Sequence, residues 1–252
     1  MASMSSVATN AIVSNLEQDE YRQSRAKRVA SKKSLRRFFG SSALTDICLD
    51  DIEKHGLCAL LQSNIPLGHF LHFSLNSFNA EILFFYLEIE LFEEYDFENT
   101  KALKRTALHL YDAFIREGAD FELNLNGAAR ESIKRKIETG DHDCFGEARD
   151  QSISMLEPNF ESFLMSDEWK DFKSQVSKLQ HGNRQTIYSK ELRNDVVIKL
   201  SKYIDGIDAK KEILEVDKGV RKRSKLLREM LHDFCRTRIH SDFHDKVKEK
   251  EK

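Results

Sequence analysis

The sequence of 252 residues contains nine histidines, a residue type that can bind transition metals. Two pairs have helical spacing, since His69 and His72 are three residues apart and His240 and His244 are four apart. A catalytic zinc site also needs a third ligand and an acid that can act as a base, and the sequence has no HExxH or CxxC pattern. The pattern therefore favours surface or packed histidines, and we expect neither a metal nor a cofactor.

Other catalytic patterns are also missing from the sequence. It contains no local signature of a Cys–His pair or a Ser-based triad, and no glycine-rich phosphate loop. Acidic residues are dense from Glu81 to Glu98, where no Lys or Arg occurs, but their spacing is that of one solvated helix face rather than of paired catalytic carboxylates. We therefore expect a protein that has no catalytic residues of its own.

The composition predicts long helices that would position these side chains. Only 2 prolines and 10 glycines occur, so turns are few, and 17 phenylalanines supply most of the aromatic core. Apolar residues recur at helical intervals, and the run 78–95 is apolar enough to be buried on most sides, with Asn79 as its N-cap. No β-alternation is visible, and the fold class is therefore all-α.

Three further expectations concern helix ends. The helix through 102–118 should end at Gly118, the helix that begins at 146 should break at Pro158, and Asp167 should cap the next one.

A boundary is expected near residue 180, followed by two more helical stretches. The second has a near-heptad apolar pattern interrupted by Gly219 and Arg223. It could pair with another chain, but we favour packing back onto the bundle, because most such runs are core stripes.

Charge is unevenly distributed although the formal net charge is only −2. That near-neutral sum argues against a nucleic-acid partner. Between Tyr21 and Thr45 eight basic residues occur without an acid. Residues 21–40 could bind an anionic membrane surface as a helix, or could be a solvated, disordered arm, and the sequence leaves both open. Four widely spaced cysteines and the absence of a secretory leader or an apolar run of about 18 residues indicate an intracellular protein without a spanning helix.

Three segments follow one another in an order that resembles the regulator of G-protein signalling (RGS) domain. They are FLHFSLNSFNAEILFFYLEIELF at 70–92, LYDAFIREGADFELNLN at 110–126 and FGEARDQSISMLEPNFESFLMSDEWKDF at 145–172. The resemblance implies an RGS-type helical bundle over 46–178, preceded by a flexible basic arm at 1–45 and followed by a helical extension at 179–252.

The resemblance also implies a surface that contacts a heterotrimeric G-protein α subunit (Gα). Glu81 and Asn124 match contact residues of the family, and Met155 and Asn159 occupy the positions of a contact Leu and Asp. The chain departs from the family pattern at two further positions. Ile82 replaces a contact Asn, and Ser162 aligns with a contact Arg across a one-residue gap.

The function implied is a GTPase activator, which binds activated Gα and stabilises its switch regions. Such a protein needs no catalytic residue, because Gα supplies its own Arg and Gln. The alternative, favoured by Ile82 and Ser162, is an RGS-homology scaffold or adaptor with little or no activating effect. A metal-dependent helical hydrolase built on the histidines is a third, less favoured reading. We expect a cytoplasmic protein, peripheral at the inner face of the plasma membrane through residues 21–40.

Overall fold

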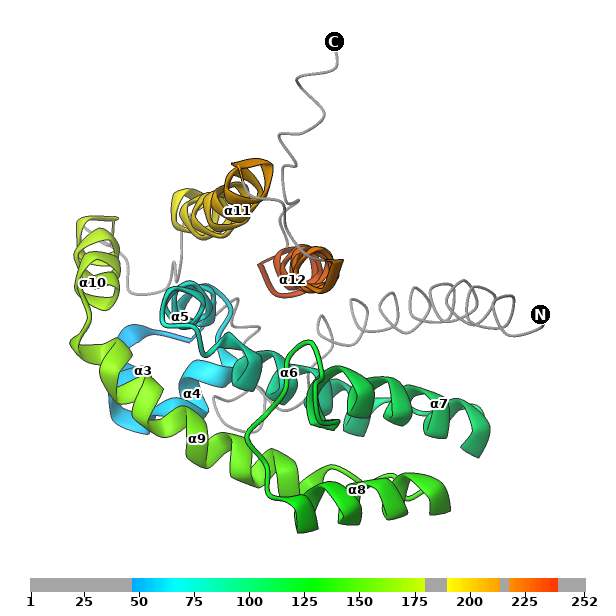
Figure 1. The fold of residues 1–252 in the computed structure, drawn as a ribbon. Helices are drawn as coiled ribbons and strands as arrows, with labels where there is room; N and C mark the ends of the chain where they lie inside the picture. Colours follow the sequence, from blue (N-terminus) through cyan, green and yellow to red (C-terminus); the bar gives the residue numbers. More distant parts are fainter. Residues whose placement is uncertain (1–46, 180–189, 214–217, 240–252) are drawn as a thin grey trace.

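The computed structural model describes residues 47–179, 190–213 and 218–239, and within these ranges all regular structure is helical (Figure 1). The expected basic arm at 1–45, with its proposed membrane segment at 21–40, and the pair His240 and His244 lie outside the described residues. None of the described helices is both long enough and apolar enough to cross a lipid bilayer. All four cysteines are described, and each is a free thiol.

The described helices follow one another along the chain. They are α3 (Leu49–His55), α4 (Leu57–Gln62), α5 (Ile65–Asn76), α6 (Ala80–Glu94), α7 (Thr100–Leu110) with a π-helical turn η1 (Tyr111–Ile115), α8 (Gly127–Thr139), α9 (Gly146–Met165), α10 (Asp167–Leu179), α11 (Lys190–Ile213), α12 (Lys218–Phe234) and a second π-helical turn η2 (Cys235–Ile239).

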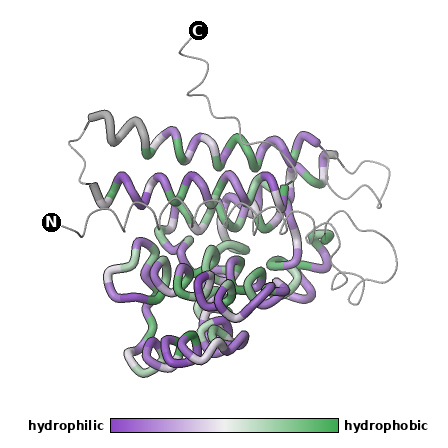
Figure 2. Tube along the Cα trace, turned by 90° about the vertical axis from the view of Figure 1, so that its right-hand side faces the viewer, coloured by the Kyte–Doolittle hydropathy of each residue, from purple (hydrophilic) through white to green (hydrophobic). Residues whose placement is uncertain are grey.

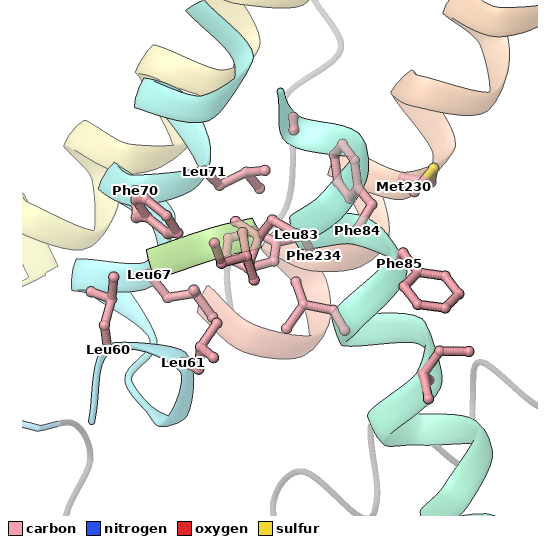
Figure 3. Close-up of a cluster of buried hydrophobic side chains, with 14 of the residues drawn as sticks. Leu60, Leu61, Leu67, Phe70, Leu71, Leu83, Phe84, Phe85, Met230 and Phe234 are labelled. Carbon is pink, nitrogen blue, oxygen red and sulfur yellow. The ribbon is translucent and has the colours of Figure 1, made fainter. Parts of the chain in front are cut away.

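Helix α6 lies at the centre of the bundle, as its apolar run predicts. Its side chains are buried on most sides, with Leu83 and Phe85 fully enclosed in the cluster that Figure 3 shows. The ring of Phe85 lies 5.6 Å from that of Phe114 and 6.2 Å from that of Phe145, both in edge-on arrangements that favour aromatic pairs. The phenylalanines therefore form the core around which the other helices pack.

The predicted break at Pro158 is wrong, because α9 runs without interruption from Gly146 to Met165. Proline removes one backbone donor inside a helix, which leaves the carbonyl group four residues earlier without its helical partner. Both Pro158 and Ser154 lie on the exposed side of α9, so water can bond that carbonyl, while Leu156 and Phe160 hold the opposite side in the core. Burial of one face thus keeps the helix continuous.

Two other predicted helix ends differ from the structure. Helix α7 ends at Leu110, and after the turn η1 the chain leaves the helix before Gly118, which has a positive φ of 73° in the following loop. At the start of α10 the capping side chain is Ser166, whose Oγ accepts a hydrogen bond from the Trp169 amide at 3.2 Å, whereas Asp167 is the first helical residue. Ser and Asp are both good capping residues, so the sequence alone did not separate them.

The two C-terminal helices pack back onto the bundle, as we favoured from the apolar pattern. Helix α11 lies so close to α5 that a Cβ atom added to Gly68 would be 2.4 Å from Val196. Leu231 and Phe234 of α12 belong to the same buried core as Leu83. Figure 3 shows Phe234 beside Leu83. In Figure 2 these helices form the upper pair, with hydrophilic and hydrophobic residues alternating along each.

Candidate protein-binding site

Three elements carry the four side chains that we expect to contact Gα. Glu81 is half-buried in the first turn of α6, and Asn124 is exposed in the loop at 116–126 between η1 and α8. Met155 and Asn159 lie four residues apart on α9, both half-buried. The structure must therefore bring a helix start, a loop and a helix face together for these residues to act as one surface.

A direct hydrogen bond joins α9 to the turn that precedes α6. The side-chain amide of Asn79 donates to Oδ1 of Asn159 at 2.8 Å. Asn79 stands at the predicted N-cap position of α6, but its side-chain oxygen accepts no capping hydrogen bond and is buried without a hydrogen-bond partner. Asn159 is therefore held beside the start of α6, and Glu81 lies in the first turn of that helix.

The α5–α6 turn also exposes an aromatic side chain that the sequence pattern assigned to an apolar position. Phe78 is 86% exposed and has a φ of 56°, in the left-handed region that non-glycine residues seldom adopt. Residues held in such sparsely populated backbone conformations cluster at functional sites, so Phe78 is a candidate binding residue. The apolar pattern does not predict this exposure, since Phe78 follows the helical spacing of its neighbours.

The loop that carries Asn124 is held in an extended form. Its backbone amides at Phe121 and Leu123 donate to the carbonyl oxygens of Ala113 and Phe114, at 3.0 and 2.8 Å. Leu123 and Leu125 are both buried, so alternation leaves the side chain of Asn124 in solvent between them. The ring of Phe121 packs 6.2 Å from that of Phe84, one turn after Glu81 on α6. This contact links the Asn124 loop to the start of α6.

Arg130, at the start of α8, holds the same loop in place through hydrogen bonds. Its guanidinium donates to three backbone carbonyl oxygens, at Leu125 and Leu123 (both 3.0 Å) and at Ile115. It also pairs with the Glu122 carboxylate at 2.8 Å. The sequence does not predict this role of Arg130. Its partners are mainly backbone carbonyl groups, which every residue type carries, so they produce no recognisable sequence pattern.

Glu122 completes this clamp from within the loop. Its carboxylate accepts a hydrogen bond from the Gly118 amide at 2.9 Å, and this bond together with the one from Arg130 lowers the pKa of Glu122. The carboxylate therefore stays ionised below its ordinary range and keeps both ends of the loop bonded to it.

Ile82 and Ser162, the two positions that depart from the family pattern, make their contacts within the chain. Ile82 is half-buried and packs against the core. Ser162 is exposed, but its hydroxyl donates to the carbonyl oxygen of Pro158 at 2.9 Å, within its own helix. Neither side chain adds a polar group that reaches outward from the surface.

The predicted histidine pair on α5 has a packing role. Nδ1 of His69 and Nδ1 of His72 lie 2.8 and 2.9 Å from the two carboxylate oxygens of Glu168 on α10, and Lys199 of α11 bonds the same carboxylate at 2.9 Å. Burial opposes ionisation of Glu168, but these three contacts outweigh it and lower its pKa. Within 47–179, 190–213 and 218–239, no group of three or more His, Cys, Asp or Glu is arranged to hold a metal ion.

The described residues form an all-α bundle in which Phe78 and Asn124 are exposed and Glu81 and Asn159 are half-buried. Two solved structures share its fold. The RGS-like domain from PDZ-RhoGEF superimposes with a TM-score of 0.53 at 12% identity, covering 73% of this chain and 97% of that chain. The PDZ-RhoGEF rgRGS domain in a complex with Gα13 bound to GTP-γ-S gives a TM-score of 0.54 at 13% identity, covering 81% and 96%.

Sequence comparison identifies the family. Residues 56–172 match the family model described as regulator of G protein signaling domain. Regulator of G-protein signaling 16 of Rattus norvegicus is 28% identical over 149 residues, which are 59% of this chain and 70% of the relative. Regulator of G-protein signaling 1 of Rattus norvegicus is 31% identical over 108 residues, 42% of this chain and 50% of the relative. Residues 56–172 therefore match an RGS domain, as the order of the motifs predicts.

The chain spans only part of these relatives, from half to 70% of their length. The likeness therefore does not extend over the whole of either relative.

Proposed function

We propose that this chain binds activated Gα and accelerates its GTP hydrolysis. The match to the RGS family model supports a regulator of G-protein signalling, and a domain of the same fold is known in a complex with Gα13. The observation that carries the proposal is Asn124, an exposed amide on a loop that Arg130 clamps from inside. Because the loop is already ordered, less conformational entropy is lost when this amide binds a partner.

The mechanism we propose is differential binding. In Gα the catalytic Arg and the Gln that orients water are already present, so a partner accelerates hydrolysis by favouring the transition-state arrangement of the switch segments. Asn124 would contact the segment that carries the Gln, while Glu81, Met155 and Asn159 would contact the rest of the switch surface. This protein would then be a regulator without catalytic residues of its own.

Nucleotide-state preference tests this proposal. The chain should bind Gα loaded with GDP and aluminium fluoride, which mimics the transition state, more tightly than Gα loaded with GDP alone. Equal binding to both forms, or none to a full Gα panel, would contradict it.

The second candidate is a scaffold of the RGS fold with little or no activating effect. Ile82 packs against the core and Ser162 bonds its own helix, so two positions that contact Gα in the family supply no outward polar group here. Ile82→Asn and Ser162→Arg separate the candidates. If both substitutions together create acceleration that the natural chain lacks, the scaffold assignment is supported.

We also propose a cytoplasmic location, with residues 21–40 binding the anionic inner face of the plasma membrane. Their eight basic residues without an acid support this. Co-sedimentation with phosphatidylserine vesicles should fall when residues 21–40 are deleted, and unchanged co-sedimentation would count against the proposal.

A further inference from the structure

Helix α12, which lies beyond the segment that matches the family model, contacts the loop that carries Asn124. Nζ of Lys222 lies 2.7 Å from the Asp120 carboxylate, and the guanidinium carbon of Arg223 lies 5.3 Å from the centroid of the Phe121 ring. Both partners belong to the loop at 116–126, and Phe121 is three residues before Asn124. The C-terminal extension therefore contacts the loop that carries Asn124, the proposed Gα-binding residue.

The other end of α12 is fixed in the core, so the contact with the loop is not that of a loose tail. Leu231 and Phe234 are buried, and in the following turn Arg238 is 2% exposed and pairs with Glu90 of α6 at 3.1 Å. Removing one partner of a buried ion pair leaves an uncompensated charge, which makes this anchor costly to break. A helix of 17 residues anchored in this way holds Lys222 and Arg223 at a set distance from the loop.

We propose that Lys222 and Arg223 are positioning residues for Gα recognition, which brace the Asn124 loop at Asp120 and Phe121. The inference rests on the proposed function, since it assigns these residues to the same binding surface. Arg130 fixes the carbonyl groups on either side of Asn124, and α12 fixes the loop at Asp120 and Phe121. The helical extension thus increases the affinity of the domain for Gα, although it lies outside residues 56–172.

The expected effect is modest because both contacts are near the surface. Lys222 is largely exposed, and exposed ion pairs and cation–π contacts each change an equilibrium by about two- to fivefold. We therefore expect Lys222→Asp, which also places two acids side by side, to weaken Gα binding by about fivefold.

The test combines three variants with two measurements. Lys222→Asp should weaken binding to Gα with GDP and aluminium fluoride, and the double variant Lys222→Asp with Asp120→Lys should restore it by recreating the pair with reversed signs. Lys225→Asp is the matched control, because it makes the same charge change on the same helix at an exposed residue whose recorded ionic contact, 4.0 Å, is with Glu229 of α12 itself. Hydrogen exchange of the amides at 118–126 in the free protein gives a readout that needs no Gα.

The outcomes separate the brace from the proposed function. Faster exchange at 118–126 and weaker binding in Lys222→Asp, both restored by the charge swap, support the inference. Unchanged exchange, or faster exchange with unchanged affinity, overturns it. If the natural chain binds no Gα at all, the proposed function falls and with it the role of the brace in recognition, whatever the exchange shows.

Discussion

Asn79 and Asn159 are joined by a 2.8 Å hydrogen bond across 80 residues of sequence, and this bond unites the turn before α6 with the middle of α9. The NH2 group of Asn79 makes this contact, while its side-chain oxygen does not cap α6. Helices α6 and α9, which carry part of the proposed contact surface, are therefore held together by a side-chain hydrogen bond.

The first prediction concerns this bond. Asn159→Ala should destabilise the fold by about 1 kcal/mol, because it leaves the Asn79 amide without its partner. The coupling energy in a double-mutant cycle with Asn79→Ala should be favourable and of similar size. Urea denaturation of the four proteins measures it, and strictly additive effects would show that the contact contributes nothing.

The second prediction concerns Arg130. Replacing it by Ala removes hydrogen bonds to three carbonyl oxygens and the pair with Glu122, so the free energy of unfolding should fall by about 2 kcal/mol and Gα binding should weaken. Arg135→Ala, at an exposed position on the same helix, is the control for loss of charge. Equal behaviour of the two variants in denaturation would contradict the clamp.

The third prediction separates folding from binding at Phe78. Phe78→Asn should leave stability unchanged or raise it by up to about 1 kcal/mol, because Asn tolerates the left-handed conformation that a phenylalanine strains to adopt. The same substitution should weaken Gα binding, since it removes the exposed ring. Calorimetric melting and a binding titration measure the two effects, and a clear loss of stability would show that the ring supports the fold.

The sequence predicted those features that depend on local pattern. The burial of α6 follows from its nearly continuous apolar run, and the packing of α12 onto the core follows from its apolar stripe. Pro158 misled because a helix with one buried face tolerates a proline on its exposed side.

The features of the site that escaped prediction are those made by the tertiary structure. Arg130 bonds mainly backbone carbonyl groups, and Phe78 is exposed only because its backbone turns into the left-handed region. Neither property leaves a spacing or a composition that a single sequence reveals.

The fourth prediction concerns pH. Burial lowers the pKa of His69 below its ordinary value of 6.5, against the opposing effect of Glu168. As the pH falls, the unfolded chain therefore binds a proton at this histidine before the folded chain does. The contribution of His69 to the free energy of unfolding is thus fully present above pH 6.5 and decreases as the pH drops below it. The slope due to one proton is at most about 1.4 kcal/mol per pH unit.

His69→Gln tests the assignment, because it removes this titration while keeping a polar side chain beside Glu168. Between pH 7 and pH 5 the free energy of unfolding should decline less steeply in the variant than in the natural chain. Parallel curves from denaturant titrations at each pH would show that His69 does not cause the decline.

The last prediction is that this chain accelerates GTP hydrolysis by Gα through the loop that carries Asn124. Single-turnover hydrolysis by a panel of Gα subunits, with the natural chain and with Asn124→Ala, tests it most directly. We predict acceleration of about tenfold or more for at least one Gα, equivalent to about 1.4 kcal/mol of transition-state stabilisation, and a loss of most of it in Asn124→Ala. No acceleration across the panel, or full activity in a correctly folded Asn124→Ala protein, would contradict the account.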